Sequence, residues 1–571
     1  MGWLFGSLRG YRRSWLTADV VAGLTVWAVL VPEALAYASI AGVSPVIGLY
    51  AAPGALIFYA AFGSSKHLIT GPMSATAALS AAAVGTYVAP SSSSFVTFTA
   101  ALAISTGIVA IVAGLLRLGF VANFISEPVL KGFIVGLALT IMVGQLPKLF
   151  GIENGSGDFF EKLWDVVKHV GDTHVLTLVI GLVSLAIVFG LKRLAPAVPG
   201  SLVAVLFGIV IVAVFKLEDH GVEIVGHIPR GLPTLGVPDA SFPDYVKLLS
   251  SGIGIMLVGF AEGLGAAKTY AARDGYEVDP NRELLGLGAA NAAAGLSSGM
   301  VVNGSLSKTA VNGSAGAHSQ ISGLIVAALT VVTLLLLTGL FEKLPETTLA
   351  AVVIAAVIEL VDIPALRRLY AIYTRRLGRA YGVAARPDFI AATAAMLGVM
   401  VFDTLPGLFI GIASSLLLLL YRASRPRVAA LGKVAGTVSH YSDLDRHPDD
   451  VSPTGVAVLR VESGLFFANA DWVRSRVREA AAEDGIHAVV LDAEAISFID
   501  VSAVEMLDQL DRDLQRRGVR LLLARDIGQV RDVVRRASDD PDLARVFPTV
   551  QDAVDAAQRG SSERPRARGS A

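Results

Sequence analysis

Thr70-Gly71-Pro72-Met73-Ser74-Ala75-Thr76 interrupts a hydrophobic stretch with Gly-Pro, after which the apolar pattern resumes as a short, alanine-rich helix. A second stretch in the other half of the chain, Asn303-Gly304-Ser305-Leu306-Ser307-Lys308-Thr309, breaks and restarts in the same style. Irregular backbone at membrane depth is tolerated only where protein or a water-filled cavity satisfies its polar groups. A matched pair of interrupted apolar segments, one in each half, therefore indicates the substrate site of a transporter.

The two restarted helices favour an anion as the ligand. Each would direct backbone N–H groups and the positive end of its dipole at the gap where it begins. Lys308 adds a full positive charge beside one of these helix starts. Alternatively, Lys308 extends to the membrane interface, as many lysines near helix ends do; its place at a helix start, where a cation is otherwise unfavourable, favours the site. The candidate substrate-binding residues are Gly71, Ser74, Ala75, Thr76, Gly304, Ser305, Ser307, Lys308 and Thr309.

Composition places most of the chain in a lipid membrane. Of the 571 residues, 54% are hydrophobic and 17% are charged, against about 45–50% and about 25% in soluble domains. The pattern predicts an α-helical polytopic membrane protein with about 14 transmembrane segments, although the short segments between 284 and 317 leave that count open by one. The predicted segments are 20–40, 46–62, 68–88, 95–116, 129–146, 174–191, 196–215, 248–271, 284–298, 306–317, 321–340, 347–361, 389–402 and 405–421.

The distribution of arginines predicts the orientation. An even number of spans places both termini on the same side, and Arg9, Arg12 and Arg13 place the N-terminus in the cytoplasm by the positive-inside rule. The same rule fits the arginine-rich loop at 367–379, while the acidic loops at 147–173 and 216–245 would lie outside. The first apolar run is long and no cleavage site follows it, so we expect no removable signal peptide. We expect a multi-pass protein of a bacterial-type inner or plasma membrane with both termini cytoplasmic.

After Arg427 the pattern changes to that of a small α/β domain. Short apolar strands at 456–461, 488–491 and 519–523 alternate with amphipathic helices at 470–482, 501–517 and 529–536. The residues from Gly560 onward are rich in Ser, Gly, Pro and Arg and are expected to be disordered. The predicted organisation is a cytoplasmic N-terminus at 1–15, a transmembrane domain at 16–427, the α/β domain at 428–558 and a tail at 559–571.

Several functions are not expected. The chain has no cysteine and therefore no disulfide, thiolate metal site or cysteine nucleophile. No metal spacing of histidines, nucleophile–base constellation or Gly-x-x-x-x-Gly-Lys-Ser/Thr phosphate loop stands out. The net charge of −1, without a basic cluster, gives no sign of nucleic-acid binding. We therefore expect no enzyme, no catalytic residues, no cofactor and no metal, and a transporter driven by an ion gradient or by exchange.

Three motifs at the start of the chain carry a resemblance: Asp19-Val20-Val21-Ala22-Gly23-Leu24-Thr25-Val26, Val31-Pro32-Glu33-Ala34-Leu35-Ala36-Tyr37-Ala38 and Ala41-Gly42-Val43-Ser44-Pro45-Val46-Ile47-Gly48-Leu49-Tyr50. Others are Glu127-Pro128-Val129-Leu130-Lys131-Gly132-Phe133, Gly275-Tyr276-Glu277-Val278-Asp279-Pro280-Asn281-Arg282-Glu283-Leu284, and Leu344-Pro345 with Leu360-Val361-Asp362. They resemble the sulfate permease (SulP) family, relatives of the animal solute-carrier anion exchangers that include prestin. The segment around Phe498-Ile499-Asp500-Val501-Ser502 resembles the STAS domain that such transporters carry. The resemblance extends from about 12 to about 558.

The resemblance implies two inverted repeats of seven segments, a core and a gate domain, and a homodimer. It places the anion between the broken third and tenth segments. The family usually has Arg where this chain has Lys308, and commonly Gln where it has Glu33. A STAS relative that is switched by phosphorylation carries Ser directly after the loop Asp, whereas Val501 follows Asp500 here, so docking or trafficking is the favoured role of this domain.

Two intramembrane acids are candidates for proton coupling. Glu262 lies in the middle of the eighth predicted segment, and Glu33 follows Pro32 in the first. A membrane-buried acid is costly to keep charged and normally faces a cavity or a partner. Proton and anion would then favour each other's binding, as a symporter requires. The alternative is a structural role, for instance Glu262 held by Lys268 or by backbone N–H groups.

The predicted function is secondary active transport of an inorganic anion, most consistent with proton-coupled sulfate uptake by alternating access. Bicarbonate, a dicarboxylate or chloride, carried by symport or exchange, are alternatives within the class. Outside it are an uncoupled anion channel and a membrane sensor that signals through the STAS-like domain.

Overall fold

The protein is described by a computed structural model. It describes residues 4–89, 92–124, 127–153, 155, 157–195, 198–358, 361, 364, 367, 386–402, 404–537 and 546–562. The chain forms two compact units, of which the first contains the helices up to Leu416 and the second begins at Leu417. The predicted arginine-rich loop beyond Arg367 lies outside the described residues, as does the predicted tail from 563.

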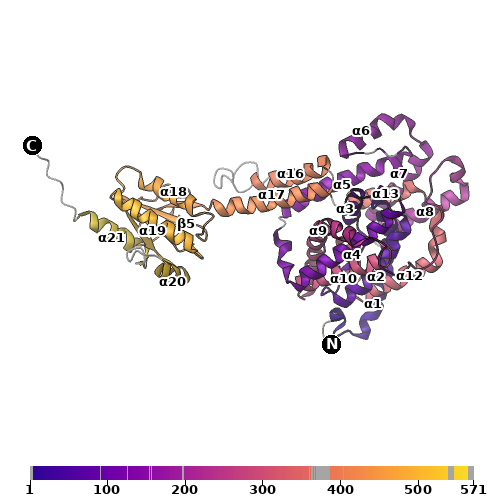
Figure 1. The fold of residues 1–571 in the computed structure, drawn as a ribbon, viewed down its shortest axis with the longest axis horizontal. Helices are drawn as coiled ribbons and strands as arrows, with labels where there is room; N and C mark the ends of the chain where they lie inside the picture. The colour runs from indigo at the N-terminus through magenta and orange to yellow at the C-terminus, as the bar shows by residue number, and fades with distance from the viewer. Residues whose placement is uncertain are drawn as a thin grey trace, which may run out of the picture. The chain divides into compact units, whose positions relative to one another are not determined.

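The first unit is a bundle of apolar helices, and each of the fourteen predicted membrane segments contains one (Figure 1). Among the described residues, eight helices are long and apolar enough to cross a membrane, and four more are shorter but apolar. The helices are α1 (Leu16–Ile40), α2 (Pro45–Phe62), α3 (Ser74–Gly85), α4 (Ser93–Leu115), α5 (Glu127–Phe150), α6 (Phe159–His169), α7 (Val175–Leu194), α8 (Gly200–Phe215), α9 (Phe242–Asp274), α10 (Pro280–Leu296), α11 (Leu306–Ser314), α12 (Ile321–Val332), α13 (Glu346–Ile358), α16 (Arg386–Phe402) and α17 (Thr404–Ser424).

One helix was not predicted. The stretch 147–173 was expected to be a loop, but it contains α6, whose N-terminus is closed by a capping box between Asp158 and Glu161. Phe160, Trp164 and Val167 are exposed on this helix. A short amphipathic helix in a polar connection has too few apolar residues to resemble a span, so the search for long apolar runs missed it.

The helices pack as two groups within the first unit. We call α1–α4 with α9–α12 the central bundle, and α5, α7, α8, α13 and α16 the peripheral bundle, because helices within each group make most of their contacts with one another. Small residues allow the close approach that membrane helices use in place of a hydrophobic driving force. A Cβ on Gly107 of α4 would lie 2.7 Å from the backbone nitrogen of Ala292 in α10.

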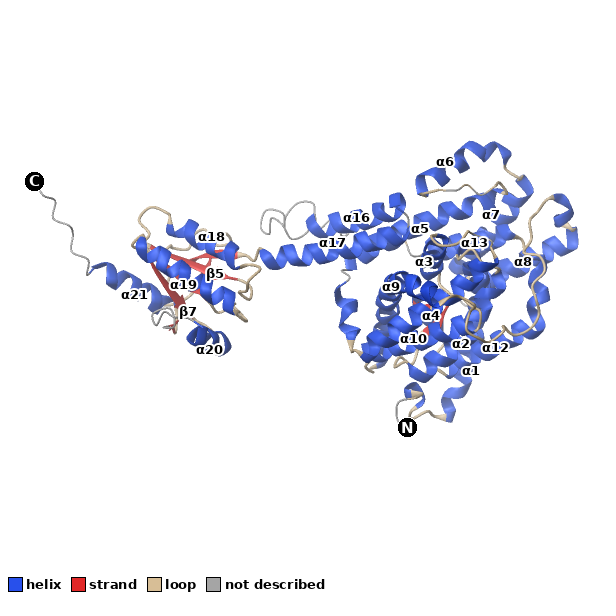
Figure 2. Cartoon of the chain, viewed as in Figure 1, coloured by secondary structure: helices blue, strands red, loops and turns tan. Residues whose placement is uncertain are grey.

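The two predicted breaks meet inside the central bundle. β1 (Ile69–Gly71) and β2 (Asn303–Ser305) pair antiparallel, with Ile69 opposite Ser305 and Gly71 opposite Asn303. Figure 2 shows this two-stranded ladder surrounded by helices. In each half the order is strand and then short helix, as expected for two inverted repeats.

The second unit is the predicted α/β domain (Figure 2). Its six-stranded sheet has the order β4-β3-β5-β6-β7-β8, with β5 to β8 parallel. Helices α18–α20 pack on one apolar face and α21 on the other. The elements are β3 (Val428–Lys433), β4 (Tyr441–Asp443), β5 (Val456–Val461), α18 (Ala470–Ala481), β6 (Ala488–Asp492), α19 (Val501–Arg516), β7 (Arg520–Ala524), α20 (Gly528–Ala537), β8 (Val546–Phe547) and α21 (Val550–Ser562).

The strands and helices predicted for this domain agree with β5, β6, β7, α18, α19 and α20. The prediction missed β3, β4, β8 and α21, and it began the disordered tail too early, because α21 continues to Ser562. Ala553 and Ala557 on one face of α21 are buried against the sheet. This packing stabilises a helix that extends past 559, although the composition there indicates disorder.

Candidate functional site

The candidate site is built where the two short helices begin. α3 starts at Ser74, after the two residues that follow β1, and α11 starts at Leu306 directly after β2. The start of α11 is capped by Ser305, whose Oγ accepts a hydrogen bond from the Lys308 backbone N–H at 3.3 Å. The start of α3 has no side-chain cap among the described residues. Helices α3 and α11 thus both begin next to one short ladder, and each directs the positive end of its dipole to this place.

Glycines let α9 approach this ladder. A Cβ on Gly304 would lie 2.8 Å from Leu68 Cδ2 and 3.0 Å from the Cα of Gly263 in α9. A Cβ on Gly259, one turn earlier in α9, would lie 3.0 Å from Asn303 Cγ. The close packing of α9 against β2 therefore requires glycine on both sides.

Lys308 makes an ion pair that the sequence did not reveal. Its Nζ lies 2.6 Å from Oε2 of Glu33 in α1, and it donates a hydrogen bond to the backbone oxygen of Pro72 at 3.2 Å. The ammonium group also lies over the ring of Tyr37, 5.1 Å from its centroid. Lys308 is 1% exposed. The lysine is therefore buried in the central bundle and does not extend to an interface.

A cavity of about 440 Å³ reaches the two helix starts. Its wall includes Glu33 and Tyr37 of α1, Ser74 of α3, and Ser305 and Ser307 at the start of α11. The far wall comes from the peripheral bundle, with Lys192 of α7, the N-terminus of α8 and part of α13. The cavity is large enough for a small oxyanion, and hydroxyl groups, the Glu33 carboxylate and the Lys192 side chain line it.

The predicted residues divide into two groups in the structure. Ser74, Ser305 and Ser307 line the cavity, as does Glu33. The others lie around the ladder and the helix starts without forming the cavity wall; they are Gly71, Ala75, Thr76, Gly304, Lys308 and Thr309. Tyr37 and Lys192 also line the cavity and were not singled out, because only tertiary packing places them there.

Polar side chains from the second half of the chain hold the first break in position. Thr309 Oγ1 accepts a hydrogen bond from the Ile69 N–H at 3.1 Å. Gln320 Nε2 donates to the backbone oxygens of Ser65 and Leu68, at 3.1 and 2.8 Å. These bonds satisfy backbone groups at membrane depth, as irregular structure there requires.

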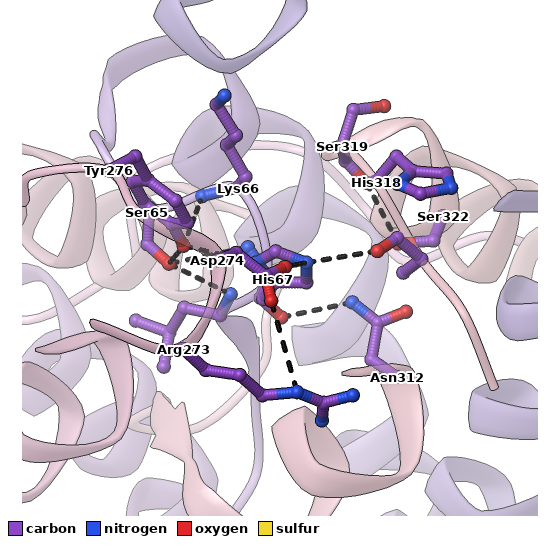
Figure 3. Close-up of polar contacts among 12 residues, drawn as sticks. Ser65, Lys66, His67, Arg273, Asp274, Tyr276, Asn312, His318, Ser319 and Ser322 are labelled. Atoms are coloured by element: carbon purple, nitrogen blue, oxygen red, sulfur yellow. Dashed lines mark hydrogen bonds and ion pairs between the residues drawn. The ribbon is translucent and has the colours of Figure 1, made fainter. Parts of the chain in front are cut away.

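The loop that leads into β1 is anchored by a polar cluster around His67 (Figure 3). His67 Nε2 lies 2.9 Å from the backbone oxygen of Ala317 and 3.0 Å from Asp274 Oδ2, while Nδ1 lies 3.1 Å from the Tyr276 hydroxyl. Burial raises the pKa of Tyr276, so its phenol stays a hydrogen-bond donor at neutral pH. Asn312 Nδ2 donates to the His67 backbone oxygen at 2.9 Å. The cluster fixes the entry to the first break.

Two buried carboxylates from the family-like motifs perform the same task at the two breaks. Glu283 accepts hydrogen bonds from the Tyr59 hydroxyl at 2.6 Å and from the Ser64 N–H at 2.8 Å. Asp19 accepts from the His318 N–H at 2.7 Å and from the Ser319 hydroxyl at 2.9 Å. Each carboxylate holds a loop next to a broken segment, and this role explains the acids in those motifs.

Glu262 lies on α9, next to the Gly263 that contacts β2. Its Oε2 is buried and has no hydrogen-bond partner within the described part of the chain. Lys268 is exposed, and no ion pair joins it to Glu262 among those residues. Glu262 does not line the cavity.

A second cavity, of about 830 Å³, lies at the opposite end of the boundary between the bundles. It is lined by the turn between α1 and α2, by Ala78 and Ala82 of α3, and by the C-terminal part of α5. Ser74 lines the first cavity and Ala78 the second. These residues are one helical turn apart, or about 6 Å along α3.

This fold and site define a polytopic membrane transporter with a discontinuous-helix site and an appended α/β domain. The chain belongs to the sulfate permease family, whose description matches residues 16–376. The STAS domain description matches residues 447–553. These matches confirm the resemblance found in the sequence.

Individual relatives agree with this assignment. The chain is 37% identical over 564 residues to the "Probable sulfate transporter MT1781" of Mycobacterium tuberculosis, which covers 98% of both chains. It is 28% identical to the "Probable sulfate transporter 3.4" of Arabidopsis thaliana, over 95% of this chain and 85% of that one. The fold is similar to that of SLC26A9, with a TM-score of 0.85 at 23% identity over 98% of this chain and 93% of the other. The transmembrane domain of the cyanobacterial bicarbonate transporter BicA matches with a TM-score of 0.61 at 22% identity, over 70% of this chain and 98% of that domain.

Proposed function

We propose that this protein imports a small inorganic anion, with sulfate as the first candidate, by proton-coupled secondary active transport. The observation that carries the proposal is the meeting of two helix N-termini on one ladder, beside a cavity that contains hydroxyl groups and reaches Glu33, the ion-pair partner of Lys308. Backbone N–H groups at helix starts bind anions. Sulfate is favoured because several relatives carry that substrate in their names.

Alternating access is the proposed mechanism. The two cavities lie at opposite ends of the boundary between the bundles, and both reach α3 within one turn of its start. A movement of the central bundle against the peripheral bundle would open the site to one cavity while closing the other. The starts of α3 and α11 would move together as a rigid unit, because the ladder joins them.

Glu262 is the proposed proton carrier for uptake, with Glu33 as a second coupling group. An acid in a membrane-spanning helix without a hydrogen-bond partner favours its neutral form, and Glu262 is such an acid within the described part of the chain. Its helix packs on β2 through Gly263, so a movement of α9 that follows a change of charge at Glu262 would reach the proposed anion site. Uptake of the proton and of the anion would then support each other.

The test is uptake of radiolabelled anions into proteoliposomes, with and without an inward proton gradient. Saturable sulfate uptake that the gradient stimulates is the expected result. Bicarbonate, dicarboxylates and chloride serve as competitors, and preferential transport of one of them would replace sulfate. Non-saturating flux without proton movement would indicate an uncoupled channel, and anion binding without flux would indicate a sensor that acts through the STAS domain.

Assembly and orientation belong to the same proposal. A homodimer in the cell membrane with both termini in the cytoplasm fits the family assignment and the arginines near the N-terminus. This orientation places Arg9 and the stretch 147–173, which contains α6, on opposite sides of the membrane. Cysteines introduced at these two places would test it by the side from which each is accessible.

A further inference from the structure

Glu33 places a negative charge in a site that the helix starts and Lys308 prepare for an anion. The carboxylate lines the cavity, whereas the Lys308 ammonium lies behind it, 2.6 Å from Glu33 Oε2. An anion that enters the cavity therefore meets Glu33 before it reaches the charge of Lys308.

Within the part of the chain that the structure describes, few charged groups face Glu33. Lys308 of α11 is its ion-pair partner, the ring of Tyr37 lies beside that lysine, and Lys192 of α7 lines the same cavity. Helices α2, α3, α8 and α12, which also pack near α1, contain no Asp, Glu, Lys, Arg or His, and the acid of α13, Glu346, pairs with Lys148 at 3.0 Å. A proton at Glu33 thus removes the one carboxylate charge among the described residues that line this cavity.

An ionised carboxylate accepts hydrogen bonds and donates none. Two anions in contact repel each other unless a proton lies between them, and this proton comes from the ligand or from the carboxylate. Sulfate is fully ionised at neutral pH and has no O–H group. Bicarbonate and hydrogen phosphate each keep one O–H group and can donate it to Glu33.

We propose that the site takes up each anion together with one proton held between the anion and Glu33. Oxyanions that carry a hydroxyl group bring this proton themselves, and sulfate binds only when Glu33 is protonated. This inference rests on the proposed anion-binding function and adds a rule of selectivity to it. The rule concerns this chain's own Glu33 and Lys308.

A purely structural ion pair predicts different behaviour. If Glu33 only neutralised Lys308, sulfate and hydrogen phosphate would depend on pH in the same way, since the two ions have the same shape and charge when phosphate is HPO₄²⁻. If Glu33 shares a proton with the ligand, only sulfate loses affinity as the pH rises. Protonation at Glu262 would affect both anions alike, because Glu262 does not line the cavity.

The experiment compares sulfate and hydrogen phosphate binding to the purified full chain in lipid nanodiscs by isothermal titration calorimetry. It covers the alkaline range in which phosphate is mainly HPO₄²⁻. Binding of sulfate that requires one proton weakens by about tenfold per pH unit in this range, so the ratio of phosphate to sulfate affinity should rise by about the same factor. In Glu33→Gln the ratio should become independent of pH, since an amide donates to sulfate without titrating. Glu33→Asp keeps the acid and should keep the rise.

The outcomes separate the two proposals. A wild-type ratio that stays constant with pH overturns the role of Glu33, and this measurement does not depend on any variant folding. A ratio that still rises in a folded Glu33→Gln protein overturns it as well. Failure of both sulfate and hydrogen phosphate to bind the wild-type protein rejects sulfate as the proposed substrate, whereas normal binding with equal pH dependence rejects only the role of Glu33.

Discussion

Removal of the Lys308 charge tests the most unexpected contact of the site. At an effective dielectric constant of about 20, two unit charges 2.6 Å apart attract by roughly 6 kcal/mol. This is an upper bound, because the carboxylate shares its charge between two oxygens and both groups lose hydration. Removing one partner of a buried pair costs about 3–5 kcal/mol, since the other charge is left uncompensated. Lys308→Met should therefore lower the thermal stability strongly.

The double variant Lys308→Met/Glu33→Gln separates stability from binding. It removes both charges, so the stability lost in Lys308→Met should return in large part. Anion binding should not return, because the positive charge is still missing. Relative to Glu33→Gln alone, the double variant should lose about 1.5–3 kcal/mol of binding energy, on the order of ten- to a hundredfold in affinity. Lys308→Arg, which restores the commoner family residue, should retain binding.

Thermal unfolding and calorimetric titration with sulfate in nanodiscs are the two assays. Sulfate binding by the double variant as tight as that by Glu33→Gln would show that Lys308 contributes nothing to ligand binding. A Lys308→Met protein as stable as the wild-type protein would show that the ion pair is unimportant for the fold.

Three further changes address coupling, packing and domain organisation. Glu262→Gln should abolish proton-driven accumulation of anion in proteoliposomes but allow exchange of labelled anion, since exchange needs no proton release; normal accumulation would remove Glu262 from the mechanism. Gly304→Ala should cost about 1–3 kcal/mol in thermal unfolding, because its Cβ would lie 3.0 Å from the Gly263 Cα. Gly71→Ala on the facing strand is the control, with 3.5 Å to Leu30 Cδ1, and an equal loss would contradict the packing argument. A chain that ends near Arg427 should still bind anion, because the ladder and both acids precede it; loss of binding by a folded truncated protein would show that the STAS domain contributes to the site.

Much of the fold was predictable because membrane spans and helix breaks have local signals. Long apolar runs gave the fourteen segments, and Gly71-Pro72 and Asn303-Gly304 gave the two breaks. The strands β5, β6 and β7 alternate regularly with helices, and this order was equally clear. Strand β3 starts only one residue after Arg427 and pairs antiparallel with β5, at the side of the parallel strands. It therefore lies outside the regular alternation of strands and helices that identified the others.

The meeting of the two breaks could be predicted from the sequence, but the charges around it could not. Residues of both breaks were chosen for helix starts that bind an anion, and the structure brings these starts together. The contact between Glu33 and Lys308 could not be found, since it depends on how α1 rotates against α11. The sequence around either residue does not indicate which residue it contacts. The sequence therefore suggested a cation that faces the ligand, whereas the structure shows a cation whose charge an acid already neutralises.

The ladder between β1 and β2 means that different parts of the chain determine the dimensions and the charge of the proposed site. Backbone hydrogen bonds set the spacing of the two helix starts, and no side-chain substitution alters that spacing directly. The net charge, in contrast, depends on side chains on α1 and α11, which can change without moving the ladder. At the proposed anion site, one or two substitutions can thus change which anion binds, while the spacing of the two helix starts stays the same.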